Sequence, residues 1–243
     1  MTRFFVMPEE MSDQTIFLTG ANFNHAKVLR LKAGEKVLVS DGQGSQCLCA
    51  VEDMQSDRAV LAVLERGEST TEAAVKVTVY MAFPKADKLE HVIQKATELG
   101  AYEIVAFPSS RCVSRPDEKS IQKKLERWQK IAASAAEQSG RSYIPKVTVL
   151  KSYAHALEQA AKADMPIMFY ENEQATTLQM ALNSRLWQTV SLLTGPEGGL
   201  EEKEVQQART AGLHICTLGR RILRCETAPL CALSAVMYAA GEF

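Results

Sequence analysis

The sequence lacks the features that would mark a membrane protein or a metalloprotein. It has no apolar run of about 18 residues, the length that a membrane-spanning helix needs, so we expect no membrane partner. Its six cysteines include no Cys-x-x-Cys pair and its four histidines are scattered, which argues against a metal site. The N-terminal stretch MTRFFVMPEEMSD is too short and too acidic for a secretory signal, so we expect a cytoplasmic protein with reduced cysteines.

A large net charge is also absent, since 28 basic and 29 acidic side chains give a formal net charge of −1. This balance does not suggest a free-standing nucleic-acid binder. Basic side chains nevertheless gather in residues 111–146, and such a patch fits contact with a polyanion at one place. A solvated helix face would give the same pattern, so charge alone leaves both interpretations open.

Residues 1–66 have the pattern of short strands joined by turns. Asn22 is expected to cap a short helix that runs through Leu29. The pattern predicts a small β-barrel domain over residues 1–70, and the polar stretch 67–74 predicts a linker. The expected strands, at hairpin spacing, are residues 15–19, 36–40, 46–51 and 59–64.

From residue 75 onward, apolar runs alternate with segments of helical periodicity. Gly100, Gly140 and Gly212 stand where helix C-caps belong. The six strand–helix units predict an α/β domain over residues 75–243, with a largely parallel sheet and helices on both faces. The expected strands are residues 75–83, 103–107, 147–150, 166–170, 190–194 and 214–218. The expected helices are residues 87–99, 117–139, 152–163, 176–184, 200–211 and 227–240.

The loop after the first of these strands, Phe83–Asp87, contains no glycine. Dinucleotide-binding folds carry their glycines at that point, so we do not expect one here. The glycines instead follow the fifth strand, in Thr194–Gly199, and a second loop at 218–228 follows the sixth. Because ligands bind outside the carboxyl ends of parallel strands, we expect the two loops to form two walls of one pocket.

The first glycine loop carries a carboxylate, Glu197, where a phosphate-binding loop would carry a lysine. Glycines let the backbone approach a flat heterocycle, and Glu197 favours a neutral or cationic ligand over a phosphate. The alternative is a structural strand–helix turn in which Glu197 only caps the next helix.

Several collinear stretches resemble one known family. LLTGPEGGL at 192–200 and LGRRILRCETA at 218–228 look like the SPOUT superfamily of RNA methyltransferases. Within it, the chain is most similar to the bacterial ribosomal RNA small-subunit methyltransferase E family, over nearly its whole length. The similarity also includes RFF at 3–5, HAKVLR at 25–30, IQKATELG at 93–100 and WQKIAASAAEQSGR at 128–141.

This resemblance implies an α/β domain with a C-terminal trefoil knot, preceded by a PUA-like RNA-binding barrel. It implies methylation of N3 of a specific uridine in 16S ribosomal RNA, with S-adenosylmethionine as the cofactor and no metal. The substrate is expected as free 16S rRNA or as the assembled small subunit. The resemblance further implies a homodimer, with Leu233 or Met237 of the apolar C-terminal helix near its interface.

The resemblance also gives residues expected roles. We expect Arg111 or Arg224 to hold the anion that forms on the uridine, although either could contact phosphate or form a structural ion pair. Glu197 is a candidate base, although a carboxylate is a weak base for this proton and holding a loop suits it better. The expected cofactor-binding residues are Leu193, Thr194, Gly195, Pro196, Glu197, Gly198, Gly199, Leu218, Gly219, Ile222, Leu223 and Arg224. The expected RNA-facing residues are Arg3, Arg30, Lys85, Lys124 and Arg141.

Two other functions are possible for such a chain. A knotted methyltransferase acting on tRNA or on a ribose 2′-hydroxyl would share both loops, but the long N-terminal barrel and the AEQSGR stretch favour the uridine-N3 family. An RNA-binding or assembly module without activity would not need intact GPEGG and ILRCET sequences.

Overall fold

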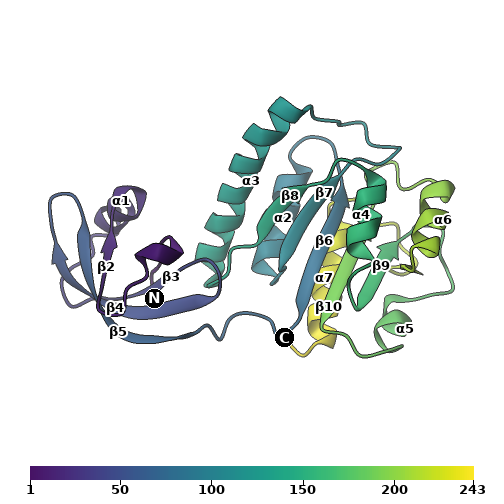
Figure 1. Ribbon diagram of the computed structural model, residues 1–243. Helices are drawn as coiled ribbons and strands as arrows, with labels where there is room; N and C mark the ends of the chain where they lie inside the picture. Colours follow the sequence, from purple (N-terminus) through teal and green to yellow (C-terminus); the bar gives the residue numbers. More distant parts are fainter. The chain divides into compact units, whose positions relative to one another are not determined.

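The computed structural model describes the backbone of residues 1–243 and every side chain except those of Glu68 and Glu118. The chain divides into two compact units (Figure 1). Unit 1 comprises Met1–Glu72 together with Ala136–Ile144, and unit 2 comprises Ala73–Ala135 together with Pro145–Phe243. The N-terminal unit is therefore discontinuous in sequence.

Unit 1 is built on one five-stranded sheet with the strand order β1-β3-β4-β5-β2. Its strands are β1 (Arg3–Phe5), β2 (Thr15–Leu18), β3 (Lys36–Ser40), β4 (Ser45–Met54) and β5 (Ala59–Glu68). It also contains the 3-10 helix η1 (Pro8–Glu10) and the helix α1 (Gly20–Val28). All pairings are antiparallel except that of β1 with β3, and β4 carries irregularities at Leu48/Cys49 and Val51/Asp53. Such bulges bend strands and help a short sheet to curl around its core.

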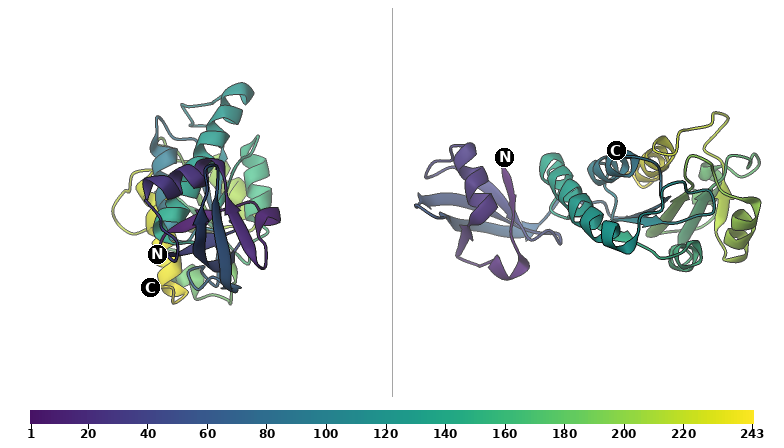
Figure 2. Two further views of the ribbon diagram at one scale, coloured as in Figure 1. Left: turned by 90° about the vertical axis from the view of Figure 1, so that its left-hand side faces the viewer. Right: turned by 90° about the horizontal axis from the view of Figure 1, so that it is seen from above.

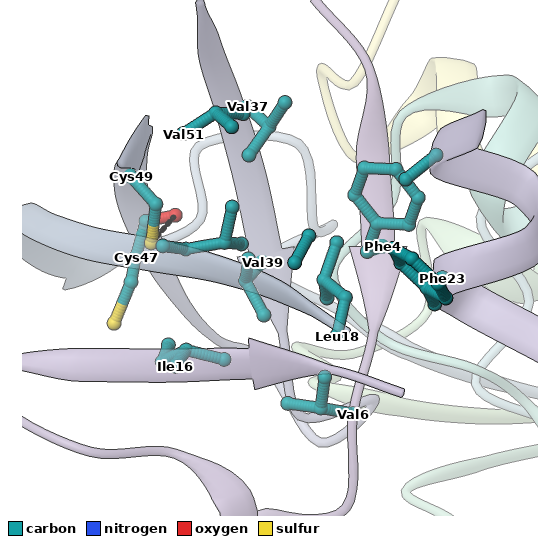
Figure 3. Close-up of a cluster of buried hydrophobic side chains, with 13 residues drawn as sticks. Phe4, Val6, Ile16, Leu18, Phe23, Val37, Val39, Cys47, Cys49 and Val51 are labelled. Carbon is teal, nitrogen blue, oxygen red and sulfur yellow. Dashed lines mark hydrogen bonds between the residues drawn. The ribbon is translucent and has the colours of Figure 1, made fainter. Parts of the chain in front are cut away.

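The core of unit 1 lies against one face of this sheet (Figure 3). Alternate residues of β3 and β4 point into it, because successive side chains of a strand face opposite sides. Cys47 and Cys49 are fully buried there as free thiols, two residues apart on the same strand. Phe4 is buried in the same cluster, so it packs in the core.

The expected capping role of Asn22 is wrong. Helix α1 begins at Gly20, with Thr19 at its N-cap, so Asn22 lies inside the first turn. Its side-chain amide instead donates a 2.7 Å hydrogen bond to the carbonyl of Phe5. Asn22 therefore attaches α1 to the end of β1.

Unit 2 contains a six-stranded, fully parallel sheet with the order β11-β9-β10-β6-β7-β8. The strands are β6 (Lys76–Ala82), β7 (Glu103–Phe107), β8 (Lys146–Val149), β9 (Met165–Phe169), β10 (Thr189–Thr194) and β11 (His214–Cys216). The helices are α2 (Lys88–Glu98), α3 (Glu118–Ser139), α4 (Tyr153–Ala160), α5 (Leu178–Leu182), α6 (Glu202–Thr210) and α7 (Thr227–Ala239). The last four residues of α3, from Ala136 to Ser139, belong to unit 1. Each predicted strand and helix of this region is present, most of them slightly shorter than predicted.

Helices cover both faces of this sheet, as predicted. Figures 1 and 2 show α2 and α7 side by side on one face and α4 on the other, and α7 packs against β6 and β10. The predicted C-cap glycines Gly100, Gly140 and Gly212 have φ of 93°, 75° and 90°, the left-handed conformation that glycine adopts without strain.

The strand order determines where the functional loops meet. The chain adds β7 and β8 on one side of β6 and then crosses over to place β10, β9 and β11 on the other side. The carboxyl ends of β9, β10 and β11 are therefore neighbours. Two backbone hydrogen bonds, from Tyr170 N–H to Cys216 C=O at 3.1 Å and from Thr217 N–H to Thr176 C=O at 2.9 Å, join the loops that follow β9 and β11.

No described helix is long and apolar enough to cross a membrane. Among the described side chains, no three His, Cys, Asp or Glu residues gather in a way that could hold a metal ion.

Candidate functional site

A cavity of about 460 Å³ lies at the carboxyl ends of β9, β10 and β11. One wall is the glycine loop at 194–199, and the facing wall is the loop at 217–225. Phe169, Tyr170 and Glu171 at the end of β9, with Lys88 from α2 and Ala228 from α7, complete the lining. The two loops that the sequence marked thus bound one cavity.

The structure brings together all the predicted cofactor residues except one. Leu193 does not line the cavity, because it is fully buried within β10. Several lining residues were not predicted from the sequence: Lys88, Phe169, Tyr170, Glu171, Thr217, Arg221, Cys225 and Ala228. The polar residues after the apolar run 165–169 were a readable signal for Tyr170 and Glu171, since this strand also ends at the ligand-binding edge.

The glycines of the first loop allow close packing of its backbone. A Cβ added at Gly195 would lie 3.1 Å from the Gly199 carbonyl carbon and 3.3 Å from the Leu200 nitrogen. Gly199 has φ +69°, and its added Cβ would lie 2.1 Å from Glu171 Oε1. The missing side chains therefore leave bare backbone at the cavity wall and room for the Glu171 carboxylate.

An ion-pair cluster lies at the rim of the cavity. The Lys88 ammonium is 3.1 Å from Glu197 Oε1 and 3.2 Å from Glu226 Oε2. The backbone N–H of Lys85 also donates to Glu197 Oε1, at 3.0 Å. Glu197 thus connects the glycine loop to the loop that precedes α2, as expected of a loop-holding carboxylate.

The cluster has shifted pKa values. Burial alone would raise the pKa of Glu197, but the Lys85 N–H and the Lys88 ammonium together hold it below its ordinary value. The hydrogen bonds that the Lys88 ammonium donates to Glu197 and, second, to Glu226 raise the pKa of Lys88. Burial, followed by the bond to Glu226, raises the pKa of Cys225 to about 12. At neutral pH the cluster therefore holds one ammonium, two carboxylates and a neutral thiol.

The two arginines that were predicted to be catalytic differ in their position relative to the cavity. Arg224 lines the cavity and is exposed. Arg111 does not line it, but its Nη1 donates a 2.9 Å hydrogen bond to the carbonyl of Gly198. Close by, the buried Glu204 accepts the backbone N–H of Ser110 at 2.8 Å, which joins the loop after β7 to α6.

The predicted RNA-facing residues separate into two groups. Arg30, Lys85 and Lys124 are exposed. Arg3 and Arg141 are only 5% and 4% exposed, because Arg3 bonds to Ser40 and Arg141 pairs with Glu72 within unit 1. This corrects the expectation that these two arginines form an open RNA-binding surface.

The two residues of α7 that were expected near a subunit interface are buried within the chain. Leu233 and Met237 are 0% and 1% exposed within the chain itself, and Met237 packs close to Gly100. They are core residues, so neither can lie at a surface for a second subunit. The exposed residues of α7 are Thr227, Cys231, Tyr238 and Ala239, and the first three form an exposed stripe along the helix.

Comparison with known proteins agrees with this architecture. Residues 71–237 match the RNA methyltransferase domain family, and residues 18–65 match the RNA methyltransferase PUA domain family. The chain is 36% identical to the ribosomal RNA small subunit methyltransferase E of Bacillus subtilis, over 98% of this chain and 96% of that protein. The Synechocystis protein of the same name is 34% identical, over 96% of this chain and 76% of that protein.

Two solved structures share the fold and carry a cofactor. The ribosomal RNA small subunit methyltransferase E of Neisseria gonorrhoeae, bound to S-adenosylmethionine, has a TM-score of 0.85, 33% identity and 98% coverage of both chains. A methyltransferase of Legionella pneumophila with the same cofactor has a TM-score of 0.82 and 26% identity, covering 98% of this chain and 97% of that one.

The fold, the glycine-walled cavity and these matches define an RNA methyltransferase with an N-terminal PUA domain. Within that class, the chain belongs to the ribosomal RNA small subunit methyltransferase E family.

Proposed function

We propose that this protein methylates N3 of a specific uridine in 16S ribosomal RNA of the small subunit, using S-adenosylmethionine. The observation that carries the proposal is the cavity with bare glycine backbone on one wall and the Glu171 and Glu197 carboxylates in its lining. The curated relatives named for small-subunit rRNA support the choice of RNA.

The residues present fit S-adenosylmethionine. A cavity of about 460 Å³ has the size of a small-molecule site, and the backbone of Gly195 and Gly199 in its lining suits a flat adenine. Carboxylates favour a cation over a phosphate, and this cofactor carries a sulfonium and no phosphate. When bound, the cofactor supplies an electrophilic methyl group.

The chain's own residues must align the uridine and stabilise its N3 anion. Arg224, exposed in the cavity wall, donates to O2 or O4 of the uracil and so favours loss of the N3 proton to solvent. Arg111 holds the glycine loop through Gly198 C=O and keeps the remaining guanidinium N–H groups for RNA. Glu197 acts as a loop anchor rather than a base, because its pKa is depressed and its Oε1 accepts hydrogen bonds from Lys85 and Lys88.

The N-terminal domain and exposed basic side chains position the RNA. We assign RNA binding to the domain at residues 1–70 and to the exposed Arg30, Lys85 and Lys124, and cofactor binding to a knotted domain at 75–243. Because N3 lies on the Watson–Crick edge, the uridine must be unpaired or flipped out of its helix. The protein acts in the cytoplasm, where small subunits are assembled.

Nucleoside mass spectrometry of RNA from a deletion strain tests the function. Loss of 3-methyluridine from one 16S rRNA position, restored by the wild-type gene and not by Arg224→Ala, is expected. Loss of a tRNA methyl group or of a ribose 2′-O-methyl group would instead support the other knotted activities. An unchanged methylation profile in all RNAs would favour a binding module and contradict the proposal.

We further propose a two-fold homodimer formed through the exposed stripe of α7. Tyr238 is 73% exposed at the end of this stripe, which is unusual for an aromatic side chain on an otherwise apolar helix. Tyr238→Glu should give a folded monomer by light scattering, whereas Leu233→Asp should unfold the chain. A wild-type protein that is fully active as a monomer at assay concentration would contradict the homodimer.

A further inference from the structure

Lys88 has an unusual position at the start of α2. It is the first residue of the helix, after Asp87 at the N-cap. A cation in the first helical turn is unfavourable, because the helix dipole makes this end positive. Some other interaction must therefore compensate for its presence.

The compensating interaction is with both walls of the cavity. Glu197 belongs to the glycine loop after β10, and Glu226 is the N-cap residue of α7, where the second wall ends. The Lys88 ammonium lies 3.1 Å from the first carboxylate and 3.2 Å from the second, and 3.7 Å from Cys225 Sγ. Among the ion pairs of the described side chains, neither carboxylate has another cationic partner.

We propose that Lys88 is a positioning residue for methyl transfer, which fixes the two walls of the cofactor cavity against the start of α2. The inference rests on the proposed function, since it requires the cavity to hold S-adenosylmethionine. The second wall, from Thr217 to Cys225, contains no helix or strand, and Gly219 to Ile222 are exposed. Because no helix or strand supports this wall, its position depends on the residues at its two ends. The ion pair with Lys88 fixes the end at Glu226.

Removal of Lys88 should disorganise the site in a specific way. Glu197 and Glu226 would face each other without a counter-ion, and their repulsion would move the walls apart. The affinity for RNA should not change, because Lys88 is engaged by the two carboxylates. The cofactor affinity should fall by the same factor as the population of the correct cavity geometry.

The same helix offers a matched control. Lys95, in the last turn of α2, forms an ion pair with Glu98 at 2.8 Å and does not line the cavity. Lys95→Met therefore removes a lysine and an ion pair from the same helix without touching the site. Lys88→Arg keeps the positive charge on a longer side chain, so we expect it to pair with both carboxylates.

The experiment begins with calorimetric titration of wild-type protein with S-adenosylmethionine. If the wild type does not bind, the proposed function fails, and Lys88 is then without a role in cofactor positioning. If it binds, Lys88→Met should raise the cofactor dissociation constant about tenfold, as for a competent population reduced to about one tenth. Its kcat should fall about 10- to 100-fold with an unchanged KM for RNA, and Lys88→Arg should recover most of both losses.

Two results would overturn the inference. One is an unchanged cofactor affinity and kcat in Lys88→Met, or equal losses in Lys95→Met. The other is full additivity when Lys88→Met is combined with Glu226→Gln, because residues that act through one another should show non-additive effects. If Lys88→Met does not fold, Lys88→Gln serves in its place, with the same expected losses.

Discussion

The Arg141 guanidinium donates two hydrogen bonds to one oxygen of the Glu72 carboxylate, at 2.7 and 3.0 Å. The other carboxylate oxygen accepts the backbone N–H groups of Ser142 and Tyr143, at 2.8 and 3.2 Å. Residue 72 ends the first segment of unit 1, and residues 136–144 form its second segment. This ion pair therefore fastens the two segments together.

Arg141→Ala should destabilise unit 1 strongly. The Arg141 side chain is buried in this pair, and removal of one partner of a buried ion pair costs about 3–5 kcal/mol because the other charge loses its counter-ion. Urea unfolding followed by circular dichroism measures the change. Arg66→Ala, which breaks an exposed pair with Asp13, is the control and should have a much smaller effect. Equal effects of the two variants would contradict this role of Arg141.

Gly195→Ala should weaken cofactor binding about 10- to 100-fold, because strain of about 1–3 kcal/mol is introduced into the loop backbone. The atoms close to the new Cβ are mostly backbone, at Gly199 and Leu200, and cannot rotate away. The larger Gly195→Val should abolish binding. Gly67→Ala is the control, since a Cβ at Gly67 meets no atom within 4 Å. A folded Gly195→Val protein with wild-type affinity in calorimetry would disprove the assignment of this loop.

Lys124→Gln should flatten the salt dependence of RNA binding. Removing one lysine that neutralises a phosphate reduces the slope of log affinity against log salt by about one, because one fewer counterion is released on binding. Lys124 is exposed on α3, whereas Lys162, just after α4, provides a control lysine outside the basic stretch. Filter binding at several salt concentrations measures the slopes, and Lys162→Gln should keep the wild-type slope. Identical slopes for wild type and Lys124→Gln would identify this part of the basic stretch as a solvated surface only.

In the Tyr238→Glu monomer, in which no second subunit covers α7, Cys231 should react with iodoacetamide long before Cys225 at pH 8. The thiolate is the reactive form, and burial raises the pKa of Cys225 to about 12, with its bond to Glu226 as the second cause. Its thiolate fraction is on the order of a thousandfold smaller than that of an ordinary thiol of pKa about 8.5. Cys231 is exposed on α7. Peptide mass spectrometry gives both rates, with the denatured protein as the control in which the difference should disappear.

Asp164 should make stability depend on pH in the acid range. Hydrogen bonds from Gln188 N–H, then from the hydroxyl and N–H of Thr189, lower its pKa in the folded state. Because the folded pKa lies below the unfolded value of about 3.9, the contribution is fully present above that pH. It is lost as the pH falls through the folded pKa. Urea unfolding between pH 3 and 6 should show the difference between wild type and Asp164→Asn shrinking on acidification, not growing.

Local pattern predicted most of the fold because strand and helix periods are properties of neighbouring residues. The apolar run at 190–194 and the cap at Gly212 are such cases, and both are present. The N-cap prediction for Asn22 was wrong because it also used neighbouring residues only. Its partner, the carbonyl of Phe5, is distant in sequence, so a rule based on neighbours gave it a cap role.

The site was predictable only where its residues follow one another in a single loop. The loop that contains Gly195 and Glu197 was readable, because glycines beside a carboxylate after a strand are a local signal. Lys88 was not, since its two partners lie more than a hundred residues further along the chain. The burial of Arg141 could not be predicted from the sequence either, because its counter-ion Glu72 lies in a stretch with the composition of a linker.

The discontinuity of unit 1 also affects the order in which the protein can mature during its own synthesis. When residue 72 has emerged from the translating ribosome, Glu72 has no Arg141 to bind, and α3 has not been made. The N-terminal unit can be completed only after residue 144 has emerged, by which time β6, α2 and β7 of unit 2 have also been translated. A nascent chain stalled before residue 136 should therefore expose a protease-sensitive N-terminal unit, and one stalled well after residue 144 should protect it.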